Sequence, residues 1–161
     1  MTCIPAALLM VFTAMVQVTW APALSVYGAF PNLVLVMVTV ITWTRGQRAG
    51  LLWACAGGLL LDLTAPGPLG PHALALLAGA YVTGFWVRNV DPYGPVHPVI
   101  ATAVSTAIYS AVLVGADDLL NLPVPAPAIV LRLAVAAAVY NSVLVLPIML
   151  VAKRLRREAA A

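Results

Sequence analysis

Charge is scarce along this chain. Of 161 residues, 8 are Lys or Arg and 5 are Asp or Glu, so that 8% of the side chains are charged, against about 25% in an ordinary soluble domain. Apolar residues make up 63% of the chain, and the mean hydropathy is +1.04. So few charges cannot cover the surface of a domain in water. We therefore expect the chain to fold in lipid.

Charges and Pro/Gly clusters divide the sequence into six apolar segments, each expected to be a helix. At about 20 residues for each crossing, the length allows roughly five to seven membrane spans. The sequence thus predicts an all-α, polytopic membrane bundle of six transmembrane helices, forming one domain over residues 1–152 with a short basic tail at 153–161. The expected helices are Ile4–Trp20, Leu24–Trp43, Ala49–Leu63, Ala73–Val87, Pro98–Ala116 and Ala128–Ala152.

Two of these segments have unusual features. Pro31 lies inside the second segment, which must either kink there or begin there with Pro31 in its first turn. The third and fourth segments are short, because fifteen helical residues rise only about 22 Å against a hydrocarbon core of about 30 Å. We expect flanking residues, or the loop between these two segments, to dip into the membrane.

The basic residues indicate the orientation. Arg45, Arg48, Arg88 and the cluster Lys153–Arg157 follow the second, fourth and sixth segments, whereas the loops at 64–71 and 117–127 contain no Lys or Arg. The positive-inside rule then places both termini in the cytoplasm. Because the basic residues are few and widely spaced before the C-terminus, we expect them to set topology, with lipid and not nucleic acid as the partner.

Two charged residues lie inside apolar segments near the predicted outer face. Asp62 ends the third segment, at the negative end of its helix dipole, and Arg132 lies about one turn into the sixth, at a positive end. An ion pair between them would offset both unfavourable positions in a medium of low dielectric constant. We favour this pair over the alternatives, which are snorkelling of each side chain to the headgroups and pairing of Asp62 with His72.

Polar side chains within the spans predict contacts between helices. Asn141 lies near the middle of the sixth segment and is expected to face the bundle, where its amide needs a partner. In the fifth segment Thr102, Ser105, Thr106 and Tyr109 share one face. This face either lines a polar path or binds neighbouring helices, and we favour the second interpretation.

Small residues recur every four positions in the third segment, at Gly50, Ala54 and Gly58. Such a stripe allows another backbone to approach closely. It indicates tight helix packing within the bundle or an interface with a partner.

No set of residues with catalytic spacing is found in the sequence. His72 and His97 are predicted on opposite sides of the membrane, no serine lies in a GxSxG motif, and Asp117 and Asp118 form the only neighbouring carboxylate pair that shares a face. The sequence contains no metal-ligand cluster and no phosphate-binding glycine loop. We therefore expect neither enzymatic activity nor a cofactor.

From Pro31 onward the sequence resembles the rod shape-determining protein MreD family. The closing segment adds Tyr140, Asn141 and Pro147 before the basic tail. Asn32 departs from the family, which commonly has Asp after the proline; any role that depends on that charge is then absent, although an amide can keep a capping hydrogen bond. The residues that carry the resemblance are Pro31-Asn32, the basic turn Arg45–Gly50, the run Gly57, Gly58 and Asp62, and Pro68-Leu69-Gly70.

The resemblance implies a function as well as a fold. It implies a non-catalytic inner-membrane scaffold of the bacterial elongation machinery that binds the single-span protein MreC and, through it, MreB and the peptidoglycan synthases. It also implies kinship with the fold of the substrate-binding components of energy-coupling transporters. A subunit of such a transporter is the alternative function, since short spans interrupted by Gly and Pro can form a ligand site. Those components typically dock their energising partner through alanines spaced four apart in the first helix, a spacing that Ala6, Ala7 and Ala14 lack.

Overall fold

The structure is a computed structural model that describes residues 3–20, 23, 25, 28–65, 67–89 and 96–158. Every regular element within these residues is a helix, which confirms the predicted all-α class. The six helices are α1 (Cys3–Thr19), α2 (Leu33–Arg45), α3 (Gln47–Thr64), α4 (Pro71–Asn89), α5 (Val96–Leu119) and α6 (Pro127–Glu158).

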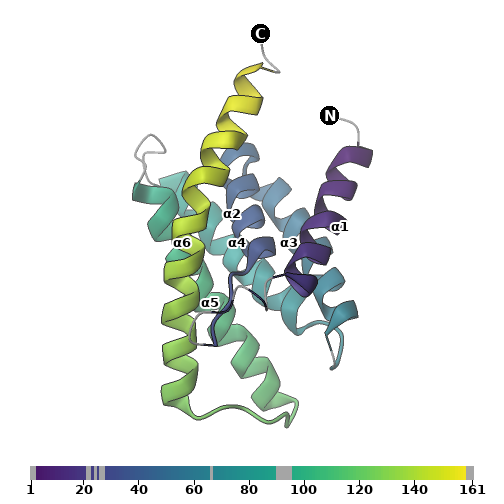
Figure 1. Cartoon of the computed structure of the whole chain (residues 1–161), viewed down its shortest axis with the longest axis vertical. Coiled ribbons are helices and arrows are strands. Elements are labelled where there is room, and N and C mark those ends of the chain that lie inside the picture. Colours follow the sequence, from purple (N-terminus) through teal and green to yellow (C-terminus); the bar gives the residue numbers. More distant parts are fainter. Residues whose placement is uncertain are drawn as a thin grey trace.

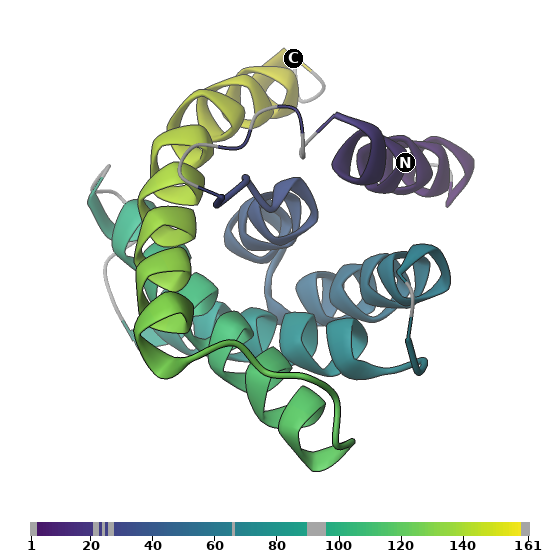
Figure 2. The same ribbon diagram turned by 60° about the horizontal axis from the view of Figure 1, so that its bottom comes forward.

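Helix α2 is the centre of the bundle. It contacts each of the other five helices, which follow one another around it in the order α1, α3, α4, α5 and α6 (Figure 2). Within the described residues α1 and α6 do not touch, so the ring is open between them. Both termini lie at one end of the bundle (Figure 1). The loops that join α3 to α4 and α5 to α6 lie at the other end.

Helix α2 begins at Leu33, so the start predicted at Leu24 is wrong and the helix has no kink at Pro31. Pro31 lies before the N-cap and not in the first turn. Asn32 is its N-cap, and the Asn32 side chain accepts a hydrogen bond from the backbone N–H of Leu35 at 2.9 Å. The helix has 13 residues, a length of about 20 Å. It is buried on every side because other helices surround it; its buried residues are Val34, Leu35, Val36, Val38, Thr39, Val40, Ile41, Thr42 and Trp43.

Helices α3 and α4 are longer than the sequence predicts. They have 18 and 19 residues, or about 27 and 28 Å, because each extends into polar or proline-containing flanks that the apolar pattern does not include. The fifteen-residue lengths predicted for these segments are therefore wrong. Helix α6 continues through Pro147 to Glu158, so the basic residues up to 157 extend the last helix.

The surface of the bundle is more apolar than that of a soluble domain, and the interior holds buried polar residues beside an apolar core. Large apolar side chains are exposed along five of the helices, for example Phe12 at 64%, Leu52 at 72% and Val139 at 61%. An exposed apolar surface of this extent is unusual on soluble monomers. Two helical stretches, Val96–Leu119 and Pro127–Ala152, are long and apolar enough to cross a membrane. The buried polar and charged residues are Gln17, Thr39, Thr42, Asp62, Thr83, Thr102, Ser105, Thr106 and Asn141.

Polar contacts join α4 to α5. The hydroxyls of Thr83 and Ser105 lie 2.7 Å apart, and Ser105 also donates to the carbonyl oxygen of Gly79 at 3.1 Å. Three of the four polar residues on the shared face of α5 are therefore buried between helices, at Thr102, Ser105 and Thr106.

Replacing Ser105 by Ala should lower the free energy of unfolding by about 1–2 kcal/mol, since the variant loses two interhelical hydrogen bonds, to the Thr83 hydroxyl and to the Gly79 carbonyl oxygen. Thermal unfolding of the purified protein in detergent measures the difference. Ser25→Ala, at an exposed position, is the control and should be neutral. Equal stability of the two variants would contradict the packing seen between α4 and α5.

Candidate functional site: the Asp62 junction and the adjoining cavity

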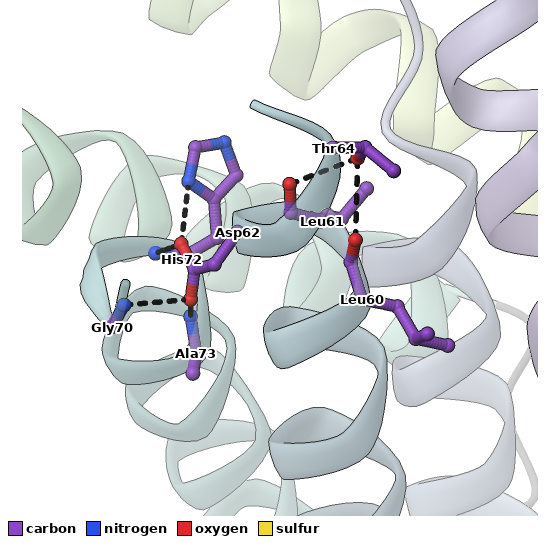
Figure 3. A network of polar contacts seen from close by, with 7 residues as sticks. All are labelled: Leu60, Leu61, Asp62, Thr64, Gly70, His72 and Ala73. Carbon is purple, nitrogen blue, oxygen red and sulfur yellow. Dashed lines mark hydrogen bonds and ion pairs between the residues drawn. The ribbon is translucent and has the colours of Figure 1, made fainter. Parts of the chain in front are cut away.

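Asp62 joins the end of α3 to the beginning of α4. The residue is buried, with 3% of its surface exposed. One carboxylate oxygen, Oδ2, accepts the backbone N–H groups of Gly70 at 3.0 Å and Ala73 at 3.2 Å, and the other, Oδ1, accepts that of His72 at 2.9 Å (Figure 3). A buried carboxylate is thus satisfied by three donors from one short segment.

These donors are the free N–H groups at the start of α4. Gly70 is the residue at the cap position, because its carbonyl oxygen accepts the first helical hydrogen bond from Leu74 at 2.9 Å, and it has no side chain with which to cap the helix. Pro71, in the first helical position, has no N–H to satisfy. Asp62 supplies the cap from the preceding helix, and its negative charge lies at the positive end of the α4 dipole.

His72 is the side-chain partner of Asp62. Its Nδ1 lies 3.2 Å from Oδ1 of the carboxylate, and its ring meets the ring of Tyr109 edge-on, with the centroids 6.3 Å apart. The predicted pair of Asp62 with Arg132 is wrong. Helices α3 and α6 do not contact each other in the described part of the chain, and Arg132 lies exposed on α6.

The carbonyl end of α3 is completed within the same junction. The hydroxyl of Thr64 donates to the carbonyl oxygens of Leu60 at 3.2 Å and Leu61 at 2.9 Å (Figure 3). The carbonyl oxygen of Leu61 also accepts the backbone N–H of Ala65 at 2.9 Å, so the Thr64 hydroxyl adds a second hydrogen bond at the end of the helix. The start of α4 is therefore capped by a side chain, and the end of α3 by a backbone N–H with a side-chain hydroxyl beside it.

Glycines in α3 make the close approach possible. A Cβ atom on Gly58 would lie 2.7 Å from the backbone nitrogen of Ala73 in α4, and one on Gly57 would lie 2.8 Å from Cγ1 of Val34 in α2. Gly50 lies against the Thr42 side chain in the same way. Ala54, between Gly50 and Gly58, is buried as well. The stripe of Gly50, Ala54 and Gly58 therefore packs against helices of this chain and presents no surface to a partner.

Several of the residues that carry the family resemblance lie at this junction or next to it. Pro31 is buried and Asn32 caps α2, whose first turn packs on Gly57. Gly58, Asp62 and Gly70 join α3 to α4 as described. Pro68 and Leu69 lie exposed in the loop between α3 and α4, so they take no part in the core of the junction.

An amide network fixes the start of α2. Asn141 accepts a hydrogen bond from the backbone N–H of Asn32 at 2.8 Å and donates one to the hydroxyl of Thr106 at 3.1 Å. Gln17 of α1 donates to the carbonyl oxygen of Pro31 at 3.0 Å and accepts from the N–H of Leu33 at 2.6 Å. Asn141 therefore faces the bundle. The sequence interpretation missed Gln17, although it is the one amide in the first apolar segment.

A cavity of about 480 Å³ lies beside the junction and the network. Most of its wall is apolar, and its polar groups come from α1, α3, α4, α5, α6 and the segment before α2. Such a wall with a few convergent polar groups is typical of small-molecule sites. The polar residues that line it are Gln17, Asn32, Thr64, His72, Thr106, Tyr109, Ser110, Asp117 and Asn141.

The Asp62 junction suits helix packing, and the cavity beside it suits the binding of a small molecule. Within the described residues, no group of three or more His, Cys, Asp or Glu residues could hold a metal ion. Comparisons with known protein families, with curated proteins and with solved structures find no match to this chain. Its function is therefore inferred from its own residues and their arrangement.

Proposed function

We propose that this protein is a non-catalytic, multi-pass scaffold of the bacterial inner membrane that serves the cell-elongation machinery. The membrane part of the proposal is supported by the apolar surface of the bundle, because exposed Leu, Val and Phe side chains suit lipid, and by buried side chains such as Thr83, Ser105 and Asn141 that hydrogen-bond between helices. Six helices then cross the bilayer, with both termini in the cytoplasm. The ends of α2, α4 and α6 that carry basic residues lie on that side.

The observation that carries the proposal is the junction itself. Gly57, Gly58, Asp62 and Gly70 are among the residues that give this chain its resemblance to the MreD family, and they hold α2, α3 and α4 together through direct contacts. Part of the resemblance therefore concerns residues that share one structural task. It favours a common fold and, with it, the scaffold role.

A single-span partner is consistent with the outer surface of the bundle. The helices present apolar faces to their surroundings, and in lipid these faces can bind another transmembrane helix through packing. The proposed partner is an MreC-like single-span protein, which would connect the bundle indirectly to MreB and to the peptidoglycan synthases.

The predicted orientation can be measured by cysteine labelling. With Cys3 and Cys55 replaced by Ala, Leu69→Cys and Pro123→Cys, both at exposed loop positions, should react with a membrane-impermeant maleimide on intact cells. Arg48→Cys, at an exposed position in the first turn of α3, should react only after the cells are opened. Labelling of Arg48→Cys in intact cells would exclude the proposed topology.

The scaffold role predicts a specific partner and a shape defect. Purification of the tagged protein in mild detergent should bring down a single-span protein with a coiled coil, and depletion should widen the cells and disperse wall synthesis along the side wall. Complementation by the intact gene should restore the width. Depleted cells of normal width, without such a partner, would rule out the role.

The cavity favours a second candidate function, that of a small-molecule-binding subunit of an energy-coupling transporter. Its volume of about 480 Å³ falls within the range of roughly 300–1,000 Å³ usual for ligand sites. The two candidates differ in their partners. A pair of ATPases in the purified complex, with loss of uptake of one nutrient on depletion, would favour the transporter.

A further inference from the structure

We propose that the cavity binds a small organic molecule with an apolar body and a neutral or positively charged polar group, and that it discriminates against anions. This inference goes beyond the scaffold role, because a scaffold needs no ligand, and it specifies the substrate class of the transporter candidate. It concerns the isolated protein and does not depend on any partner.

The charges around the cavity exclude recognition of an anion. Asp117 lines the wall near the end of α5, and among the described residues that form the wall there is no Lys or Arg. His72 also lines it, but its imidazole lies against the carboxylate of Asp62 at 3.2 Å, so any positive charge on the ring is already compensated. A carboxylate or phosphate would lose its hydration without gaining a counter-charge.

Uncharged polar groups are available to bind the polar part of the ligand. Asn141 is fully buried and already bonds to Asn32 and Thr106, so it stays in the network that fixes α2. The hydroxyls of Tyr109 and Ser110 line the same wall, and each can donate or accept. These groups suit a hydroxyl, an amine or a heterocyclic nitrogen.

Small residues in α6 create the space for the apolar body. Ala134 and Ala137 lie three residues apart on the face of α6 that lines the cavity, opposite Leu113 of α5. Val135, next to Ala134, points outward and is 56% exposed. Of these two adjacent residues, Ala134 therefore faces the cavity and Val135 does not.

Three probes that share one ring system test the charge preference. Tryptamine is a cation at neutral pH, tryptophol is neutral and indole-3-acetate is an anion. Binding to the full-length protein in phosphatidylcholine nanodiscs is measured by equilibrium dialysis, with empty nanodiscs subtracted. Tryptamine should bind at least about tenfold more tightly than indole-3-acetate, with tryptophol between them.

Variants locate the binding site and the origin of the preference. Asp117→Asn should bring the affinity for tryptamine down to that for tryptophol, while leaving tryptophol unchanged. Ala134→Phe should fill the cavity and so weaken the binding of both tryptamine and tryptophol by at least about tenfold. Val135→Phe is the matched control and should bind like the unsubstituted protein. Because Asp117 is partly exposed, its variant tests the proposal even if Ala134→Phe does not fold.

Three results would each overturn the inference. The first is that indole-3-acetate binds as tightly as tryptamine. The second is that Ala134→Phe and Val135→Phe, when both variants fold, weaken binding equally. The third is that no probe binds at about 1 mM, since an affinity below that is too weak for a useful site. None of these results bears on cell width or on the recovery of a single-span protein. Failure of this inference and failure of the scaffold role can therefore be distinguished.

Discussion

Replacing Asp62 by Ala should lower the free energy of unfolding by about 3–5 kcal/mol, the largest effect expected of a polar substitution in this protein. The variant would leave the N–H groups of Gly70, His72 and Ala73 without their common acceptor. It would also remove the negative charge from the start of α4 and the ion-pair partner from His72. Unfolding of the purified protein by heat or by SDS in mixed micelles measures the loss.

Two further substitutions make this result specific. Asp62→Asn keeps an oxygen acceptor but loses the charge, so its loss of stability should lie between that of Asp62→Ala and zero. Asp118→Ala removes an exposed carboxylate from α5 and should change stability by less than about 0.5 kcal/mol. If Asp62→Ala were as stable as Asp118→Ala, the capping role of Asp62 would be wrong.

Replacing Gly58 by Leu should be at least as damaging, because the added Cβ would overlap the backbone at Ala73. Backbone atoms cannot move aside as a flexible side chain can, so α3 and α4 must separate, at a cost of about 3 kcal/mol or more. The separation would also draw Asp62 away from the N–H groups that it caps. The expected result is a protein that is recovered in low yield or unfolds at a much lower temperature.

Gly115 offers a matched control for Gly58. It lies within α5, and a Cβ atom there would meet nothing within 4 Å. Gly115→Leu should therefore be neutral or slightly stabilising, since a helix favours Leu over Gly by about 0.8 kcal/mol. In the double variant Gly58→Leu/Asp62→Ala, the losses should be less than additive, because both substitutions break one junction. Additive losses would mean that the two residues act separately.

The sequence predicted six helical segments and the breaks between them because local residues mark those breaks. It placed the start of the second helix at Leu24, whereas α2 begins at Leu33, because the apolar pattern starts before the helix does. Pro31 with Asn32 begins α2, the turn at Gly46 with its φ of 90° separates α2 from α3, and Gly70-Pro71 begins α4. Each of these signals acts over a few residues and needs no knowledge of the rest of the fold. The lengths of α3 and α4 were underestimated because apolar periodicity ends before the hydrogen-bonded helix does.

The partner of Asp62 could not be predicted by the same reasoning. Depth in the membrane and helix dipoles made Arg132 and His72 both plausible, but the choice depends on which helices touch. In the structure α3 contacts α4 and not α6. The same limit applies to the cavity, whose walls come from several elements far apart in the sequence. No single stretch carries a pattern from which a space between helices can be predicted.

The central position of α2 has a consequence for biogenesis. In the proposed membrane bundle this helix of 13 residues is shorter than the roughly 20 residues that a lipid-exposed span requires, and its final surroundings are protein. Partition into lipid therefore cannot by itself hold α2 in the membrane while the chain is being made. The tight turn at Gly46 joins it to α3, and we expect the two to insert together as a hairpin, with α2 acquiring its surroundings only when α5 and α6 have been made.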